Sequence, residues 1–97
     1  MAIGGYPTAF ILKDTTTVTV GSSSAQSSAL NNRSLHYRVI SSCDCHIEVG
    51  KNPTATTGSG MLPAYTIEYI IVPEGEKIAF LKFSTQTGTA YITECTR

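Results

Sequence analysis

The residues with the clearest potential for chemistry are the thiols and the imidazole of the run Cys43-Asp44-Cys45-His46, which could bind a metal ion. A structural zinc site needs about four ligands, usually supplied by two such groups. The remaining cysteine, Cys95, does not complete a second C-x-x-C or H-x-x-x-H group. We also expect the two thiols of C-x-C to point to opposite faces of a strand. The sequence therefore predicts packing residues at these positions, with no metal and no cofactor.

Nucleophilic catalysis would need a serine or cysteine beside a base, and His36 and His46 are the conventional bases of the chain. Both lie in segments with the alternation of strands, where a polar-face histidine needs no catalytic explanation. Among the carboxylates, Glu74 and Glu76 flank Gly75 in a predicted turn and are solvated. The sequence does not pair the others as a glycosidase site requires. We therefore predict that the protein is not an enzyme.

Composition narrows the class of protein further. The chain has 97 residues, a formal net charge of zero and 14% charged residues, which indicates one small domain with little field to attract nucleic acid. Its apolar runs are far shorter than the roughly 18–20 residues of a membrane span, so we expect no membrane segment. The odd number of cysteines, three, argues against structural disulfides. The first residues lack the basic region of a signal peptide, and we expect synthesis in the cytoplasm.

Apolar and polar residues alternate with a period of two along most of the chain, which predicts an all-β fold. The expected strands are Thr15–Val20, Leu35–Ser41, Cys45–Val49, Thr66–Val72, Lys77–Phe83 and Thr89–Cys95. Short strands at this spacing are typical of an antiparallel β-sandwich or a small barrel, and we favour a jelly-roll-like sandwich. Residues 15–97 form the single domain. Residues 1–14 are either an N-terminal arm or a first strand.

The connections carry further expectations. Ser42–Asp44 and Pro73–Glu76 are short and rich in turn formers, which predicts two hairpins. Gly21–Asn32 is small and polar and is predicted as a loop, and Gly50–Ala64 as the longest loop. Thr66–Val72 is apolar on both faces, so we expect it to be a central strand covered on both sides.

Large apolar residues also occur in segments that look too irregular for the interior of a sandwich. They are Ile3, Tyr6, Phe10, Met61, Leu62 and Tyr65. Exposed clusters of this kind usually mark an interface. These residues are therefore the predicted partner contacts, and the predicted role is self-association combined with docking.

The pattern from Ile47 to Leu81 contains I-E-V-G-K-N-P-T-A-T, then L-P-A, then T-I-E-Y-I-I-V-P-E-G-E-K-I-A-F-L, and G-T-A-Y-I-T-E follows near the end. It resembles small accessory virion proteins of tailed bacteriophages. Many of these carry a G-x-N-P-x-A-T segment, an L-P-A bend, a V-x-x-G-x-K-I-A strand pair and a final strand that ends in Thr-Glu. The resemblance covers about half of the chain.

This resemblance implies a β-sandwich or jelly roll that decorates the outside of the capsid as a cement protein. The implied partners are the major capsid protein and copies of the chain itself, as a dimer or trimer, and the implied location is the virion. A neck, tail or receptor-binding module of the same virion is the alternative. No functional residue transfers, because the matching positions look structural: Gly50, Asn52, Pro53, Ala55, Leu62, Pro63, Gly75 and Lys77.

Overall fold

The described part of the chain is built from β-strands. The computed structural model describes residues 10–33 and 35–96, and no helix occurs within these ranges. The strands are β1 Ile11–Val20, β2 Ala25–Gln26, β3 His36–Ser41, β4 Cys45–Gly50, β5 Gly60–Leu62, β6 Glu68–Ile71, β7 Lys77–Lys82 and β8 Gly88–Thr96. The prediction of an all-β fold is confirmed.

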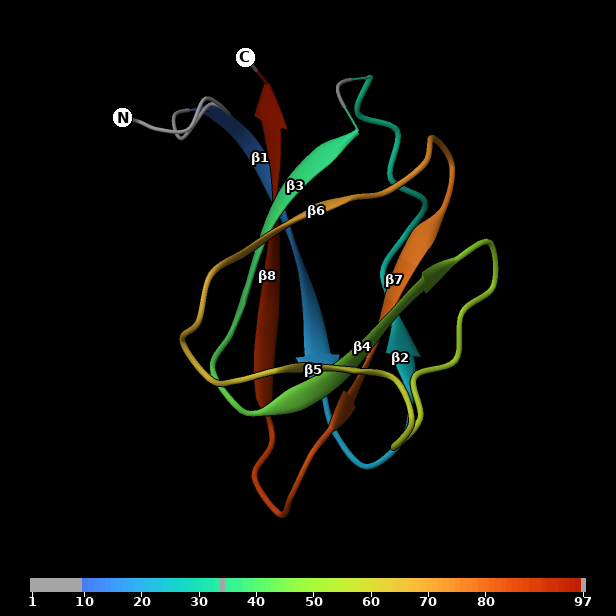
Figure 1. Cartoon of the computed structure of the whole chain (residues 1–97), viewed down its shortest axis with the longest axis vertical. Helices are drawn as coiled ribbons and strands as arrows, with labels where there is room; N and C mark the ends of the chain where they lie inside the picture. The colour runs from blue at the N-terminus through green and yellow to red at the C-terminus, as the bar shows by residue number, and fades with distance from the viewer. Residues whose placement is uncertain (1–9, 34, 97) are drawn as a thin grey trace.

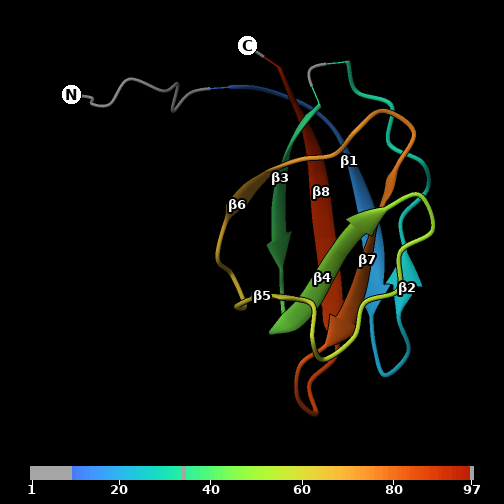
Figure 2. The ribbon, with the colours of Figure 1, turned by 45° about the vertical axis from the view of Figure 1, so that its right-hand side comes forward.

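The strands form two four-stranded sheets, which we call the first sheet and the second sheet. The order is β1-β8-β3-β6 in the first sheet and β2-β7-β4-β5 in the second. Every described strand pair is antiparallel. The two sheets lie as two layers (Figures 1 and 2). This architecture agrees with the predicted class of antiparallel, sandwich-like folds.

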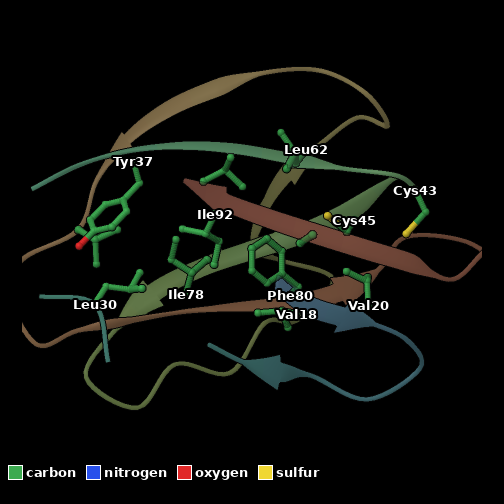
Figure 3. Packing of buried hydrophobic residues seen from close by; sticks show 13 residues of the cluster. Val18, Val20, Leu30, Tyr37, Cys43, Cys45, Leu62, Ile78, Phe80 and Ile92 are labelled. Atoms are coloured by element: carbon green, nitrogen blue, oxygen red, sulfur yellow. The ribbon is translucent and has the colours of Figure 1, made fainter. Parts of the chain in front are cut away.

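The two layers enclose one apolar core, to which alternate residues of both sheets contribute (Figure 3). Its buried members are Val18, Val20, Leu30, Tyr37, Val39, Cys43, Cys45, Leu62, Val72, Ile78, Phe80, Ala90 and Ile92. Removing a large side chain of this kind from water stabilises the fold by about 1.5–3 kcal/mol. Because side chains alternate across a strand, the neighbours of these residues point to the outer faces of the sheets.

Strand β1 covers the predicted segment Thr15–Val20 and begins earlier, at Ile11. It pairs with β8 on both sides of a register shift around Lys13 and Asp14. Such a bulge bends a strand and increases its twist. From the sequence, residues 1–14 are either an arm or a first strand. The structure places residues 11–14 in strand β1.

The two predicted hairpins are wrong. Ser42–Asp44 joins β3 in the first sheet to β4 in the second, and Pro73–Glu76 joins β6 in the first sheet to β7 in the second. At the first of these corners the amide of Ser42 still donates to the carbonyl of Thr89, at 3.0 Å, before the chain crosses. Turn-forming residues bring about a change of direction, but they do not decide whether the next strand pairs beside the last one or lies in the opposite layer.

Strand β6 corrects the prediction that Thr66–Val72 is central. It pairs with β3 and forms the edge of the first sheet (Figure 2). Ile70 packs against the core, whereas Tyr69 and Ile71 are 49% and 61% exposed. Apolar residues on both faces therefore reflect an edge strand whose outer face is apolar and open, not a strand covered on both sides.

Both predicted loops contain a short strand. Gly21–Asn32 includes β2, which pairs with β7, and Gly50–Ala64 includes β5, which pairs with β4. The loop prediction is wrong at these positions, because strands of two and three residues are too short for a period of two to show. Leu30, from the first of these segments, is buried in the core.

Candidate docking surface

In the structure, the Cys43–His46 run packs into the fold. Cys43 precedes β4 and Cys45 is the first residue of that strand, and both belong to the core. This corrects the expectation that their thiols point to opposite faces, because side chains two residues apart along an extended chain point to the same side, here into the core. Within residues 10–33 and 35–96, no group of three or more His, Cys, Asp or Glu side chains is placed to hold a metal ion.

No disulfide joins the cysteines Cys43, Cys45 and Cys95, and all three are buried. Burial raises the pKa of the Cys45 and Cys95 thiols, because the thiolate is poorly solvated there. Near Cys95 a backbone hydrogen bond and the charge of Arg38 oppose this effect in part. Both thiols are therefore protonated at neutral pH, and poor nucleophiles as a result.

We expect the free energy of unfolding to fall as the pH rises above about 9. Burial also raises the pKa of Tyr37, so the folded chain keeps protons that the unfolded chain releases from its thiols near pH ~8.5 and from its tyrosines near pH ~10. The stabilisation is complete below the unfolded pKa and is lost as the pH passes through the folded pKa. Urea titrations at a series of pH values measure the slope. In a Cys45→Ala/Cys95→Ala variant the decline should be shallower, and a constant stability of the unaltered chain from about pH 8 to about pH 10 would contradict the expectation.

The two histidines have packing roles. His46 is buried on the outer side of the second sheet, with Nδ1 3.2 Å from the carbonyl of Ser59 and its ring 5.4 Å from that of Phe83. The sequence predicts a surface histidine at this position, and the structure differs because Ser59 and Phe83 cover it. His36 lies with its ring 5.6 Å from that of Phe10. These contacts place both rings in packed positions.

The outer face of the second sheet is covered by the segment between β4 and β5. Gln26 on β2 donates from Nε2 to Asn52 Oδ1 at 2.7 Å and to the carbonyl of Pro53 at 2.9 Å. Ala55, in the same segment, is buried. Ala79 of β7, which alternates with core positions and so faces this side, is fully buried as well. This face is therefore largely occupied by the chain itself.

The outer face of the first sheet, by contrast, exposes large apolar side chains. Leu12 on β1, Tyr91 on β8, and Tyr69 and Ile71 on β6 are each 41–61% exposed. Along its own strand each of these residues alternates with buried ones, or it is in register with a residue of the next strand that does so. Their side chains therefore lie on the same face of the sheet. Between them lie threonines and, in register with Tyr69, Arg38 of β3; Thr15 and Thr93 join β1 to β8 through a 2.9 Å contact of their hydroxyls. Several large apolar side chains exposed on one face of a small domain usually mark an interaction site.

Phe10 ties the start of β1 to this face. Its ring lies 5.3 Å from that of Tyr69, nearly parallel at 28°, and 5.6 Å from that of His36. The start of β1 lies beside the end of β8, where Ile11 is in register with Thr96. An aromatic pair of this kind contributes about 0.5–1.5 kcal/mol beyond its buried area. The position of the Tyr69 ring on the face is therefore fixed by a second ring.

Tyr65 is an exposed aromatic residue held in an unusual backbone conformation. Its φ of 58° lies in the left-handed region, and its side chain is 73% exposed. Two hydrogen bonds hold the segment: the amide of Ala64 donates to Asp44 Oδ1 at 2.7 Å, and the amide of Tyr65 donates to the carbonyl of Ser41 at 2.8 Å. Left-handed geometry is uncommon for a bulky residue and is kept only where the surroundings enforce it. The structure thus presents this ring to solvent just before β6.

The predicted contact residues that the structure describes do not lie together on one surface. Leu62 is fully buried in the core, so the expectation that it is exposed is wrong; it occupies the inward position of β5, and its neighbour Met61 the outward one. Met61 lies on the second sheet, in register with His46, and so in the other layer from the apolar face that Phe10 joins. Tyr65 is exposed before β6. Ile3 and Tyr6 lie outside the described residues.

Sequence reasoning missed the residues that form most of this surface: Leu12, Tyr69, Ile71 and Tyr91. The available signal was the run Thr66–Val72, whose second apolar face has to meet either another layer or a partner. No family model, curated protein or solved structure matches the chain. No helix of the described residues is long and apolar enough to cross a membrane.

Proposed function

We propose that the protein is a non-enzymatic structural protein of a bacteriophage virion, a capsid decoration or cement protein that binds the outer shell and bridges capsid subunits. The observation that carries the proposal is the exposed apolar outer face of the first sheet, beside a second sheet whose outer face is covered by its own chain. The proposed partners are the major capsid protein and further copies of the chain.

The strand order supports this proposal through the fold. Consecutive strands alternate between the two sheets except for β4 and β5, which are neighbours in the second sheet. We propose that this arrangement of eight strands in two four-stranded sheets is a jelly roll, a fold common in viral capsid and lectin domains. Fold alone does not define function, and the argument therefore depends on the apolar face.

A cement protein has to hold subunits together through many weak contacts that symmetry repeats. Each large apolar side chain buried on docking contributes about 1.5–3 kcal/mol before the costs of association. Leu12, Tyr69, Ile71 and Tyr91 supply such groups on a sheet, which is a rigid support. The formal net charge of zero adds no long-range repulsion between neighbouring copies.

Binding to purified capsids tests this role. We expect a Leu12→Ser/Tyr91→Ser variant to keep its fold and to bind capsids of the parent phage at least about tenfold more weakly, because it removes two apolar groups from the outer face. A Phe83→Ser variant is the matched control, since Phe83 is also exposed but lies against His46 on the second sheet. If only the control weakens binding, the docking face is misassigned; if unaltered protein does not bind capsids, the role is wrong.

Copy number separates the proposed role from its alternative. A decoration protein is present in hundreds of copies per particle, whereas a neck, tail or receptor-binding module is present in about three to a dozen, as the symmetry of those structures requires. Quantitative mass spectrometry of purified virions measures this number. A low copy number would favour the neck or tail module, which could use the same apolar face for adhesion.

A further inference from the structure

Strand β6 is an edge whose backbone groups can be assigned a direction. In an antiparallel pair, residues alternate between those that bond to the neighbouring strand and those that do not. The amide of Val72 donates to the carbonyl of Leu35 at 2.9 Å, which follows the register of β6 and β3 one step further. Ile70, two residues earlier, therefore bonds toward β3. The amides and carbonyls of Tyr69 and Ile71 point away from β3, toward the open edge.

The other side of β3 gives an independent check of this assignment. The amide of Ser42 donates to the carbonyl of Thr89 in β8, one step beyond the register of β3 and β8. Even-numbered residues of β3 thus bond toward β8, and odd-numbered residues, such as Tyr37, bond toward β6. Tyr37 is in register with Ile70, as the assignment requires.

The β6 edge also lacks the features that usually prevent pairing with another chain. Exposed edges are commonly protected by lysines, bulges or prolines within the strand. The opposite edge of the sheet, β1, has such a bulge around Lys13 and Asp14. Strand β6 carries one charge, Glu68 at its start, and exposes Tyr69 and Ile71. It is short, so any pairing has to combine a few main-chain bonds with apolar side-chain contacts.

We infer that β6 is the self-association edge of this protein, and that it pairs antiparallel with β6 of a second copy about a two-fold axis. The inference rests on the proposed function, in which copies bind side by side, and specifies the surface they use. A single strand paired with its own copy is self-complementary, as a two-fold interface requires. The two first sheets then continue into one another.

The residues of β6 suit such a pair. With the axis at Ile70, Tyr69 lies opposite Ile71 of the second copy, and these are the residues whose backbone groups point to the edge. An aromatic residue opposite a β-branched one is a favourable cross-strand pair. Glu68 lies opposite Val72, so the two carboxylates do not face each other. Pro73, which has no amide hydrogen, follows and ends the pairing.

This pairing also explains the position of the apolar face. Tyr69 and Ile71 belong both to the edge and to the outer face of the first sheet. Two copies joined at β6 would therefore place their two outer faces side by side, which suits a partner built from repeated subunits.

Sedimentation equilibrium on the full chain tests the inference. We expect the unaltered protein to form dimers, and Tyr69→Lys to raise the dimer dissociation constant by at least about tenfold, because a lysine on an edge strand opposes pairing. Ile71→Pro should do the same, since it removes an amide that points to the open edge but not one that bonds to β3. Far-UV circular dichroism establishes that each variant is folded, and Tyr69→Lys keeps the test valid if the proline variant is not.

Tyr91→Lys is the matched control, because Tyr91 has similar exposure on the same face but lies on the central strand β8. We expect it to leave the dimer unchanged. If it dissociates the dimer as strongly as Tyr69→Lys, copies associate through the face and the edge inference is wrong. A monomer at millimolar concentration, including one in which residues 1–9 occupy the edge, would also overturn it. Capsid binding by the unaltered protein is measured separately, so a failure of the edge inference can be distinguished from a failure of the proposed function.

Discussion

Replacement of Phe80 by alanine is expected to lower the free energy of unfolding by about 3–5 kcal/mol. Phe80 on β7 is fully buried, and its ring lies between the two layers near Val18, Val20 and Ile78 (Figure 3). Loss of the ring removes its transfer free energy and leaves a cavity that close-packed strands cannot fill. A domain of this size is stable by about 5–15 kcal/mol, so the variant should lose a large part of its stability.

Urea denaturation followed by circular dichroism measures this loss. Phe83→Ala removes the same side chain one residue beyond the end of β7, where the ring is 54% exposed. We expect this control to change the free energy of unfolding by less than about 1 kcal/mol, the usual range for surface positions. Equal losses in the two variants would show that Phe80 does not lie in a closed core and would contradict the two-layer arrangement.

The strands themselves could be predicted because alternation is a local property of the sequence. Lys77–Phe83 was predicted and β7 spans Lys77–Lys82, with Ile78 and Phe80 on the inward face. Cys45–Val49 and Leu35–Ser41 agree equally well with β4 and β3. In each case the burial of alternate side chains determines both the secondary structure and the pattern that reveals it.

The pairing of strands could not be predicted from the same pattern. Ser42–Asp44 has the composition of a hairpin turn, yet β3 pairs with β8 and β6, while β4 pairs with β5 and β7. Nearly all partners are therefore distant in sequence. A turn fixes the backbone of a few residues, whereas the choice between the same sheet and the opposite one depends on which pairing buries more of the whole chain.

The sequence predicts that the protein has a docking surface, but it points mostly to the wrong residues for that surface. The large apolar residues of the irregular segments include Phe10 and Tyr65, but also Leu62, which is buried. A segment between Pro and Gly residues can still place one side chain in the core, as β5 does with Leu62. Tyr69 and Ile71 were assigned to the interior because an edge strand and a central strand can carry the same apolar pattern.

Asn32 is a buried polar residue that the sequence did not single out, and it links three parts of the fold. Its backbone amide donates to the hydroxyl of Tyr37 at 2.9 Å. Its side-chain Nδ2 donates to the backbone carbonyls of His36 at 3.1 Å and Cys95 at 3.0 Å. It lies at the end of a small, polar stretch where nothing in residue type or spacing distinguishes it from its neighbour Asn31. Only the folded chain brings the end of β8 to this side chain.

Replacement of Asn32 by alanine should therefore lower the free energy of unfolding by about 1–3 kcal/mol. The substitution removes two hydrogen bonds and leaves the carbonyl of Cys95, which is buried, without this donor. Each of these hydrogen bonds contributes about 0.5–1.5 kcal/mol, because the buried carbonyls lose a donor that water does not replace. Urea denaturation gives the loss directly, and Asn31→Ala, at an exposed position, is the control that should change little.

An Asn32→Asp variant separates hydrogen bonding from packing. Aspartate has nearly the same shape but cannot donate from either oxygen when ionised, so it faces the carbonyls of His36 and Cys95 with a second acceptor. We expect this variant to lose at least as much stability as Asn32→Ala near neutral pH, and to recover part of it when acid protonates the carboxyl group and restores a donor. If Asn32→Asp were as stable as the unaltered chain at pH ~7, the two Nδ2 hydrogen bonds would not hold the end of β8 against β3.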